Sequence, residues 1–177
     1  MRRNLLLELR IRGFGILWIR CLIFKPIGEF RKKLRQHAEM CLKIYDVLDK
    51  QKLQPVIRLD AVSENVSKIK PHGLFDLFCL ESYAKFEVKT SKQDKCLVKQ
   101  IVSTNFYLFC FLKSNKVMVG YGKCLKKQEL KRVDTGYDVC YVVTPENPCL
   151  KQIGVCKPFR ITEKLDYNFL KGLKDVD

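Results

Sequence analysis

The spacing of apolar residues predicts one long helix in the first third of the chain. From Glu29 onward, apolar side chains recur at steps of four, three, four and three residues, at Leu34, Ala38, Cys41, Tyr45 and Leu48. Such steps place side chains along one face of a helix, and most of the nearby basic residues fall off that face. We expect the helix to end before Pro55, because the residue before a proline disfavours helical backbone angles.

Six later segments have the length and apolar content of β-strands, namely residues 56–59, 74–80, 83–90, 105–112, 116–121 and 137–143. Segment 83–90 alternates strictly between two kinds of side chain, which is the period of a strand. Ser114-Asn115 predicts a hairpin. The polar residues 60–73 predict a loop, and we expect a short helix over 91–100 and a terminal helix over 163–173.

This order of elements predicts an α/β fold with a mixed central sheet flanked by helices. A chain of 177 residues has room for one domain with a real core. We assign that domain to residues 28–177, preceded by a basic and apolar segment over residues 1–27.

The first 26 residues are rich in arginine and apolar side chains, with Glu8 as the only acid. Arginines interrupt the apolar run, so no stretch is long enough to span a bilayer. An amphipathic helix and a strand pair that turns at Gly13-Phe14-Gly15 are both open interpretations. An organelle-import segment ranks behind them.

The balance of charge favours nucleic acid as a partner. Lysine and arginine number 34 against 19 acidic residues, for a formal net charge of +15. Such an excess attracts polyanions. Anionic membrane is the second and less favoured partner. Candidate nucleic-acid-binding residues are Lys85, Lys92, Lys95, Lys99, Lys113 and Lys116.

The nine cysteines do not resemble a disulfide or zinc framework. They are spread singly, no Cys-x-x-Cys pair occurs, and the chain has only two histidines. Cys96 and Cys124 lie beside lysines, but we expect them to be ordinary thiols. These features predict an intracellular, reducing compartment.

Asp76 is the residue that most needs an explanation, because it lies inside the apolar run 74–80. An unpaired buried carboxylate is strongly unfavourable. Glu87 and Lys89 follow on one face of the next predicted strand. A hairpin around Glu81-Ser82 would bring them close to Asp76, and two carboxylates beside an ammonium suit Mg²⁺.

Asp76, a ten-residue gap and Glu87-Val88-Lys89 resemble the motif of the PD-(D/E)XK nucleases, a superfamily that includes restriction endonucleases and Holliday-junction resolvases. The resemblance covers residues 28–112, with Phe75 where the motif's name implies proline. It implies a restriction-endonuclease-like core and a metal-dependent endonuclease that acts on DNA, including structured or branched DNA. A homodimer is plausible on the same ground.

The resemblance also implies roles for individual residues. Asp76 and Glu87 would hold Mg²⁺, for which Mn²⁺ can substitute, and Lys89 would assist the attacking water. Glu39, in His37-Ala38-Glu39 on the predicted helix, is similar to an acid that completes the metal site, with Glu29 as the competing candidate.

Two alternatives stay open. Asp76, Glu87 and Lys89 could form a cross-strand ion pair without catalysis. The whole chain could be a non-catalytic nucleic-acid-binding protein, associated with RNA or the ribosome. Glu-x-Lys is a weak signal in a lysine-rich chain, since Glu129-Leu130-Lys131 repeats it.

Overall fold

A seven-stranded mixed sheet forms the centre of the protein. The computed structural model describes residues 6–9, 17–20, 29–58, 75–136 and 138–175. The sheet has the order β12-β11-β8-β7-β5-β4-β3. Its strands are β3 (Pro55–Ile57), β4 (Leu77–Cys79), β5 (Ala84–Ser91), β7 (Phe106–Phe111), β8 (Lys116–Tyr121), β11 (Leu150–Cys156) and β12 (Phe159–Ile161). The β5–β7 pair is parallel and the other neighbours are antiparallel, so the predicted α/β class with a mixed sheet is confirmed.

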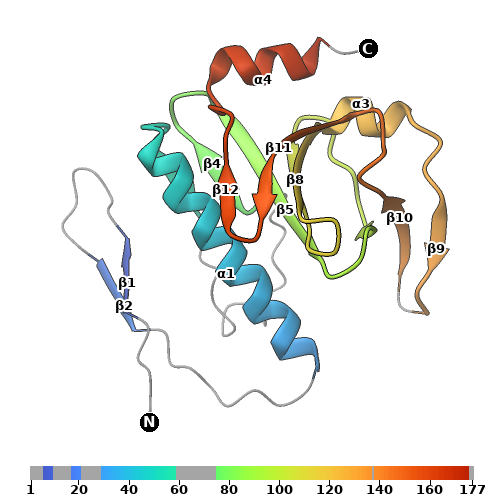
Figure 1. Cartoon of the computed structure of the whole chain (residues 1–177), viewed down its shortest axis with the longest axis horizontal. Coiled ribbons are helices and arrows are strands. Elements are labelled where there is room, and N and C mark those ends of the chain that lie inside the picture. The colour runs from blue at the N-terminus through green and yellow to red at the C-terminus, as the bar shows by residue number, and fades with distance from the viewer. Residues whose placement is uncertain (1–5, 10–16, 21–28, 59–74, 137, 176–177) are drawn as a thin grey trace.

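Two helices cover one face of this sheet. The long helix α1 (Glu29–Lys50) crosses the sheet, and α4 (Tyr167–Lys174) lies at one end (Figure 1). Ile44 and Leu48 of α1 are fully buried and belong to one apolar cluster with Phe86 and Val88 of β5. Burial of side chains of this size stabilises the fold by roughly 1.5–3 kcal/mol each, which holds α1 against β5.

The other face is covered by a second, smaller sheet and a short helix. The smaller sheet has the order β6 (Cys96–Val98), β10 (Val139–Val143) and β9 (Arg132–Asp134), and the helix is α3 (Gly122–Lys127). Aromatic side chains at positions 107, 109 and 111 of β7 point into this second core with Leu125. Helices therefore flank one face as expected, whereas the smaller sheet together with the short α3 covers the other.

Several predicted elements are confirmed. The helix from Glu29, strands β5, β7, β8 and β10, and the β7–β8 hairpin all form. Strand β4 is shorter than the predicted run and starts after Asp76. Helix α1 ends at Lys50, and Lys52 (φ 61°) and Gln54 (φ 48°) then adopt left-handed backbone angles that turn the chain toward β3.

The helix expected over 91–100 is wrong. Cys96 and Val98 are buried on either side of an exposed Leu97, and β6 pairs with β10 instead. Strand β11 was not predicted, because exposed Lys151 and Gln152 and an internal glycine break its apolar pattern. The terminal helix begins at Tyr167 rather than at 163, since the Asp166 side chain accepts from the N–H of Phe169 and caps it there.

Cys124 and Cys149 form a disulfide, so the expectation that Cys124 is an ordinary thiol is wrong. The two residues are 25 positions apart, and only the tertiary fold brings α3 beside the start of β11. Other cysteines of the described chain are free, among them Cys41 and Cys79. The cysteines of the described chain therefore do not support the prediction that every thiol is reduced.

Near the N-terminus, β1 (Leu6–Leu9) pairs antiparallel with β2 (Leu17–Arg20), as the strand-pair interpretation expects. The proposed turn at Gly13-Phe14-Gly15 and the loop over 60–73 lie outside the described residues. Among the helices that the structure describes, none has the length and apolar character to cross a membrane.

Candidate active site

Asp76 lies where β4 separates from β5. Its backbone N–H donates to the carbonyl of Phe86 at 2.8 Å, so it still belongs to the β4–β5 ladder. One residue pair further along, the N–H of Val88 donates to Asp76 Oδ2 at 2.7 Å. Asp76 lies in an apolar run and needs a partner for its charge. The Val88 N–H supplies one such partner and favours the ionised carboxylate.

Glu87 and Lys89 project from β5 on the same face, as their alternation predicted. Both are partly buried, and the Lys89 Nζ lies 2.6 Å from Glu87 Oε1. By contrast, Glu129 and Lys131 of the second Glu-x-Lys sequence are exposed between α3 and β9. Strand geometry therefore separates the two occurrences.

The three groups also interact through their charges. Burial raises the pKa of Glu87 above its ordinary value, helped by the negative charge of Asp76 and opposed by Lys89. Burial works the same way on Asp76, but contacts with His37, the Val88 N–H and Lys89 outweigh it and hold the pKa of Asp76 below its ordinary value. Burial lowers the pKa of Lys89, yet the two carboxylates raise it above its ordinary value overall. Asp76, Glu87 and Lys89 thus influence one another's protonation.

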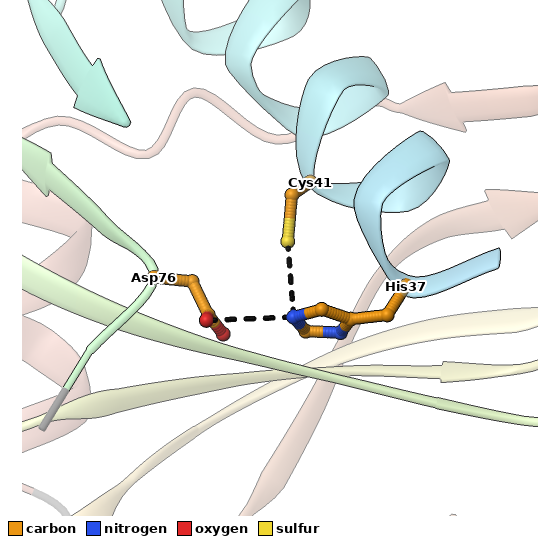
Figure 2. A group of neighbouring side chains, drawn as sticks. All are labelled: His37, Cys41 and Asp76. Carbon is orange, nitrogen blue, oxygen red and sulfur yellow. Dashed lines mark hydrogen bonds and ion pairs between the residues drawn. The ribbon is translucent and has the colours of Figure 1, made fainter. Parts of the chain in front are cut away.

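Helix α1 adds two side chains that the sequence did not assign to the site. His37 Nε2 lies 3.4 Å from Asp76 Oδ1 and 3.5 Å from the Cys41 Sγ (Figure 2). The two helical residues are four apart, so they share the face that packs against β5. The donor atoms of all three residues lie within 4.8 Å of one another and could hold a metal ion.

Cys41 is fully buried beneath this group. Burial, followed by the negative charges of Asp76 and Glu87, raises the pKa of its thiol far above the ordinary value. Without a bound metal ion, Cys41 is therefore a neutral thiol.

The structure does not bring Glu39 to the site. Positions two apart on a helix face different directions, and Glu39 is exposed on α1, 3.7 Å from Arg35. His37 occupies the place that the family resemblance assigned to an acid. Its spacing of four from Cys41, a member of the apolar stripe, was the available signal. The side chain of Glu29 lies outside the described part of the structure.

A pocket of about 450 Å³ opens beside the site. Its walls include His37 and Lys89, together with Lys92 and Lys95 from the segment after β5. The pocket therefore lies next to His37 and Lys89 and has a basic wall, which suits a phosphate group.

The other candidate lysines are distributed unevenly. Lys113 and Lys116 lie at the end of the sheet where β5 finishes, since Phe111 pairs with both Ser91 and Lys116. Lys85 lies toward the opposite end, 5.7 Å from the Phe75 ring, and Lys99 pairs with Asp138 at 2.8 Å. Of the six predicted contacts, Lys92 and Lys95 thus line the pocket, and Lys113 and Lys116 lie at the same end of the sheet.

No protein-family model, curated protein or solved structure matches this chain.

Proposed function

We propose that this protein is a metal-dependent endonuclease that hydrolyses phosphodiester bonds in DNA. The observation that carries the proposal is the grouping of Asp76, Glu87 and Lys89 beside a pocket with lysines in its wall. A bare structural ion pair would need only Glu87 and Lys89. The second carboxylate, held in place by Val88 and His37, suits a cation better.

The order of the elements supports the resemblance to the PD-(D/E)XK nucleases. A helix, a strand, the strand that follows Asp76 and the strand of Glu87 and Lys89 succeed one another as α1, β3, β4 and β5. The segment after β5 departs from the expectation, since it forms β6 rather than a helix. A restriction-endonuclease-like core is accordingly part of the proposal.

The donor set fits a hard divalent cation. Asp76 and Glu87 would hold Mg²⁺, or Mn²⁺ in its place, because both ions prefer carboxylate oxygens. When bound, the ion would polarise the scissile phosphate and lower the pKa of a bound water. The Val88 N–H and His37 orient Asp76 for this task, which is the usual work of groups behind a metal ligand.

Lys89 acts in its charged form. Its pKa lies above its ordinary value, since Glu87 and Asp76 favour the ammonium. A protonated amine cannot take a proton from water, so its role is to stabilise negative charge that develops on the phosphate oxygens. Lys92 and Lys95 would hold neighbouring phosphates at the pocket without reading sequence.

The test is cleavage of supercoiled plasmid and of a four-way DNA junction with Mg²⁺, with Mn²⁺ and with EDTA. We expect cleavage with either metal and none with EDTA. Glu87→Gln should abolish cleavage, because it removes a proposed metal ligand. Binding of DNA should persist, because Glu87 is only partly buried on β5 and the substitution keeps the size of the side chain. Binding that falls steeply with salt, without cleavage under any metal, would instead identify a non-catalytic nucleic-acid-binding protein.

A further inference from the structure

Three donor atoms of different chemistry converge between α1 and the start of β4. They are an imidazole nitrogen of His37, the sulfur of Cys41 and a carboxylate oxygen of Asp76, and their side chains point toward one another (Figure 2). The two carboxylates described above form a hard, all-oxygen donor set. The group in Figure 2 has a different preference, because thiolate and imidazole favour borderline and soft cations.

Two of the three distances between the donor atoms match the ligand spacing of a tetrahedral metal site. Zinc binds nitrogen and oxygen at roughly 2.0 Å and sulfur at roughly 2.3 Å, so two tetrahedral ligands lie about 3.3 Å apart for N and O and about 3.5 Å apart for N and S. In this structure His37 Nε2 is 3.4 Å from Asp76 Oδ1 and 3.5 Å from Cys41 Sγ. Both distances agree with the expected spacing.

Hydrogen bonds account for these contacts less well. The 3.4 Å between His37 Nε2 and Asp76 Oδ1 exceeds the usual range of roughly 2.7–3.2 Å for an N–H···O bond, whereas the 3.5 Å to Cys41 Sγ is an ordinary length for a hydrogen bond that involves sulfur. The same ring nitrogen faces the carboxylate and the sulfur. It carries at most one proton, and one N–H cannot point well at two acceptors, whereas a single cation would satisfy all three groups at once.

The surroundings are also those of a metal site. The second oxygen of Asp76 accepts from the Val88 N–H at 2.7 Å, which orients the carboxylate and leaves Oδ1 toward His37. His37 lines the pocket, so an ion and a water molecule have a path to the group. Three protein ligands and one position open to solvent are the arrangement of reactive zinc sites.

We propose that His37, Cys41 and Asp76 form a binding site for one Zn²⁺ ion. The site shares Asp76 with the proposed nuclease centre but does not require that the protein cleaves nucleic acid. If the nuclease proposal holds, Zn²⁺ occupies a ligand of the Mg²⁺ site and inhibits cleavage.

The test is metal titration of the full-length protein after removal of bound metal with a chelator. Co²⁺ serves as the probe, because thiolate coordination gives a charge-transfer absorption and tetrahedral geometry gives intense visible bands. We expect both signals at one Co²⁺ per chain, and their loss on addition of one equivalent of Zn²⁺. A wild-type protein without the thiolate band overturns the proposal.

Cys41→Ser should weaken Zn²⁺ binding by more than about 100-fold, since changes behind the ligands alone cost roughly 10–100-fold. Cys79→Ser is the matched control, because Cys79 is an equally buried free thiol on β4. It should keep the signals unchanged. If both variants or neither lose the thiolate band, the assignment is wrong.

His37→Gln provides a second variant in case Cys41→Ser does not fold. His37 is partly exposed, so its replacement leaves the core intact, and circular dichroism checks the fold. We expect the visible bands to weaken and Zn²⁺ affinity to fall as for Cys41→Ser; unchanged affinity contradicts the proposal. These readouts use no nucleic acid, so a protein that binds Zn²⁺ without cleaving DNA refutes only the nuclease proposal.

Discussion

The N–H of Val88 donates to the carboxylate of Asp76 at 2.7 Å, at the point where β4 and β5 part. A side-chain oxygen thus takes the place of a main-chain acceptor in the ladder. The bond satisfies a strand donor and orients the carboxylate at the same time. Asp76 therefore stabilises the β4–β5 pair and is also a residue of the candidate site.

The stability that Asp76 contributes should depend on pH. Its pKa is lower in the folded protein than its ordinary value, so folding favours the ionised form. This contribution is fully present above the unfolded pKa of about 3.9 and is lost as the pH falls through the lower folded pKa. We expect Asp76→Asn to cost about 2 kcal/mol at neutral pH, the scale of a charged hydrogen bond.

Urea unfolding of wild type and Asp76→Asn at pH 7 and at strongly acidic pH measures this difference. The difference in unfolding free energy between wild type and Asp76→Asn should be large at pH 7 and should disappear at strongly acidic pH. An equal gap at both pH values would show that the charge of Asp76 does not stabilise the fold.

Lys89→Met should reduce cleavage by at least about 100-fold, the usual effect of removing one group that stabilises transition-state charge. Lys89→Arg keeps the positive charge and should lose less. Initial rates at saturating Mg²⁺ compare the two variants. Wild-type rates for Lys89→Met would exclude the role assigned to this ammonium.

Glu39→Gln should leave Mg²⁺-dependent cleavage unchanged. The structure places Glu39 in an exposed pair with Arg35, and such a pair on a helix contributes only about 0.3–0.5 kcal/mol. The family resemblance implies the opposite result, namely loss of cleavage. A rate assay on this single variant decides between the helix geometry and the resemblance.

Replacement of Lys92 and Lys95 by alanine should weaken DNA binding and lower the salt dependence of log K by about 2, one for each phosphate contact. The control is the double variant Lys50→Ala and Lys171→Ala, which removes the same charge from exposed positions at the far end of α1 and on α4. Binding isotherms at several salt concentrations compare them. Equal losses in both would mean that net charge, not the pocket wall, drives binding.

Replacement of Cys124 and Cys149 by serine should lower the unfolding free energy by about 3.5 kcal/mol, from the chain entropy of a loop of this length. Urea unfolding of wild type with and without reductant provides the comparison. The double variant should match reduced wild type and should not respond to reductant. A reductant-sensitive double variant would point to a different cystine.

The sequence predicted the strand half of the candidate site well, because the relevant signals are local. Asp76 stands out within its apolar run, and period-two alternation puts Glu87 and Lys89 on one face. The turn near Glu81 then brings the two segments together. Neighbouring strands joined by a short turn leave little freedom in how they pair.

The helix half was harder, because the contact between α1 and the sheet spans about 40 positions of the chain. The apolar stripe places Cys41 toward the sheet, and a residue four positions earlier lies on the same side. The helical spacing therefore places His37, and not Glu39, toward the sheet, whereas the resemblance implied a role for Glu39. Helix phase was the better guide.

The strands were predictable where they are fully apolar, as in β7, or alternate strictly, as in β5, and not where consecutive exposed polar residues and a glycine interrupt the pattern, as in β11. Gly154 in β11 shows the reason. A Cβ at this position would lie 2.0 Å from the carbonyl oxygen of Arg160 on β12, so close strand packing requires glycine here. Local propensity treats the same residue as a strand breaker.

The short connection from Leu80 to Tyr83 controls more than the direction of the chain. It determines that Phe78 pairs with Lys85, and hence that Asp76 meets Val88. One inserted residue would slip the strands by a single position and turn alternate side chains to the opposite face. Such a slip would turn Leu77 and Cys79 of β4 away from the core and would part the Asp76 carboxylate from the Val88 N–H, so the number of residues in this turn constrains the core and the candidate site together.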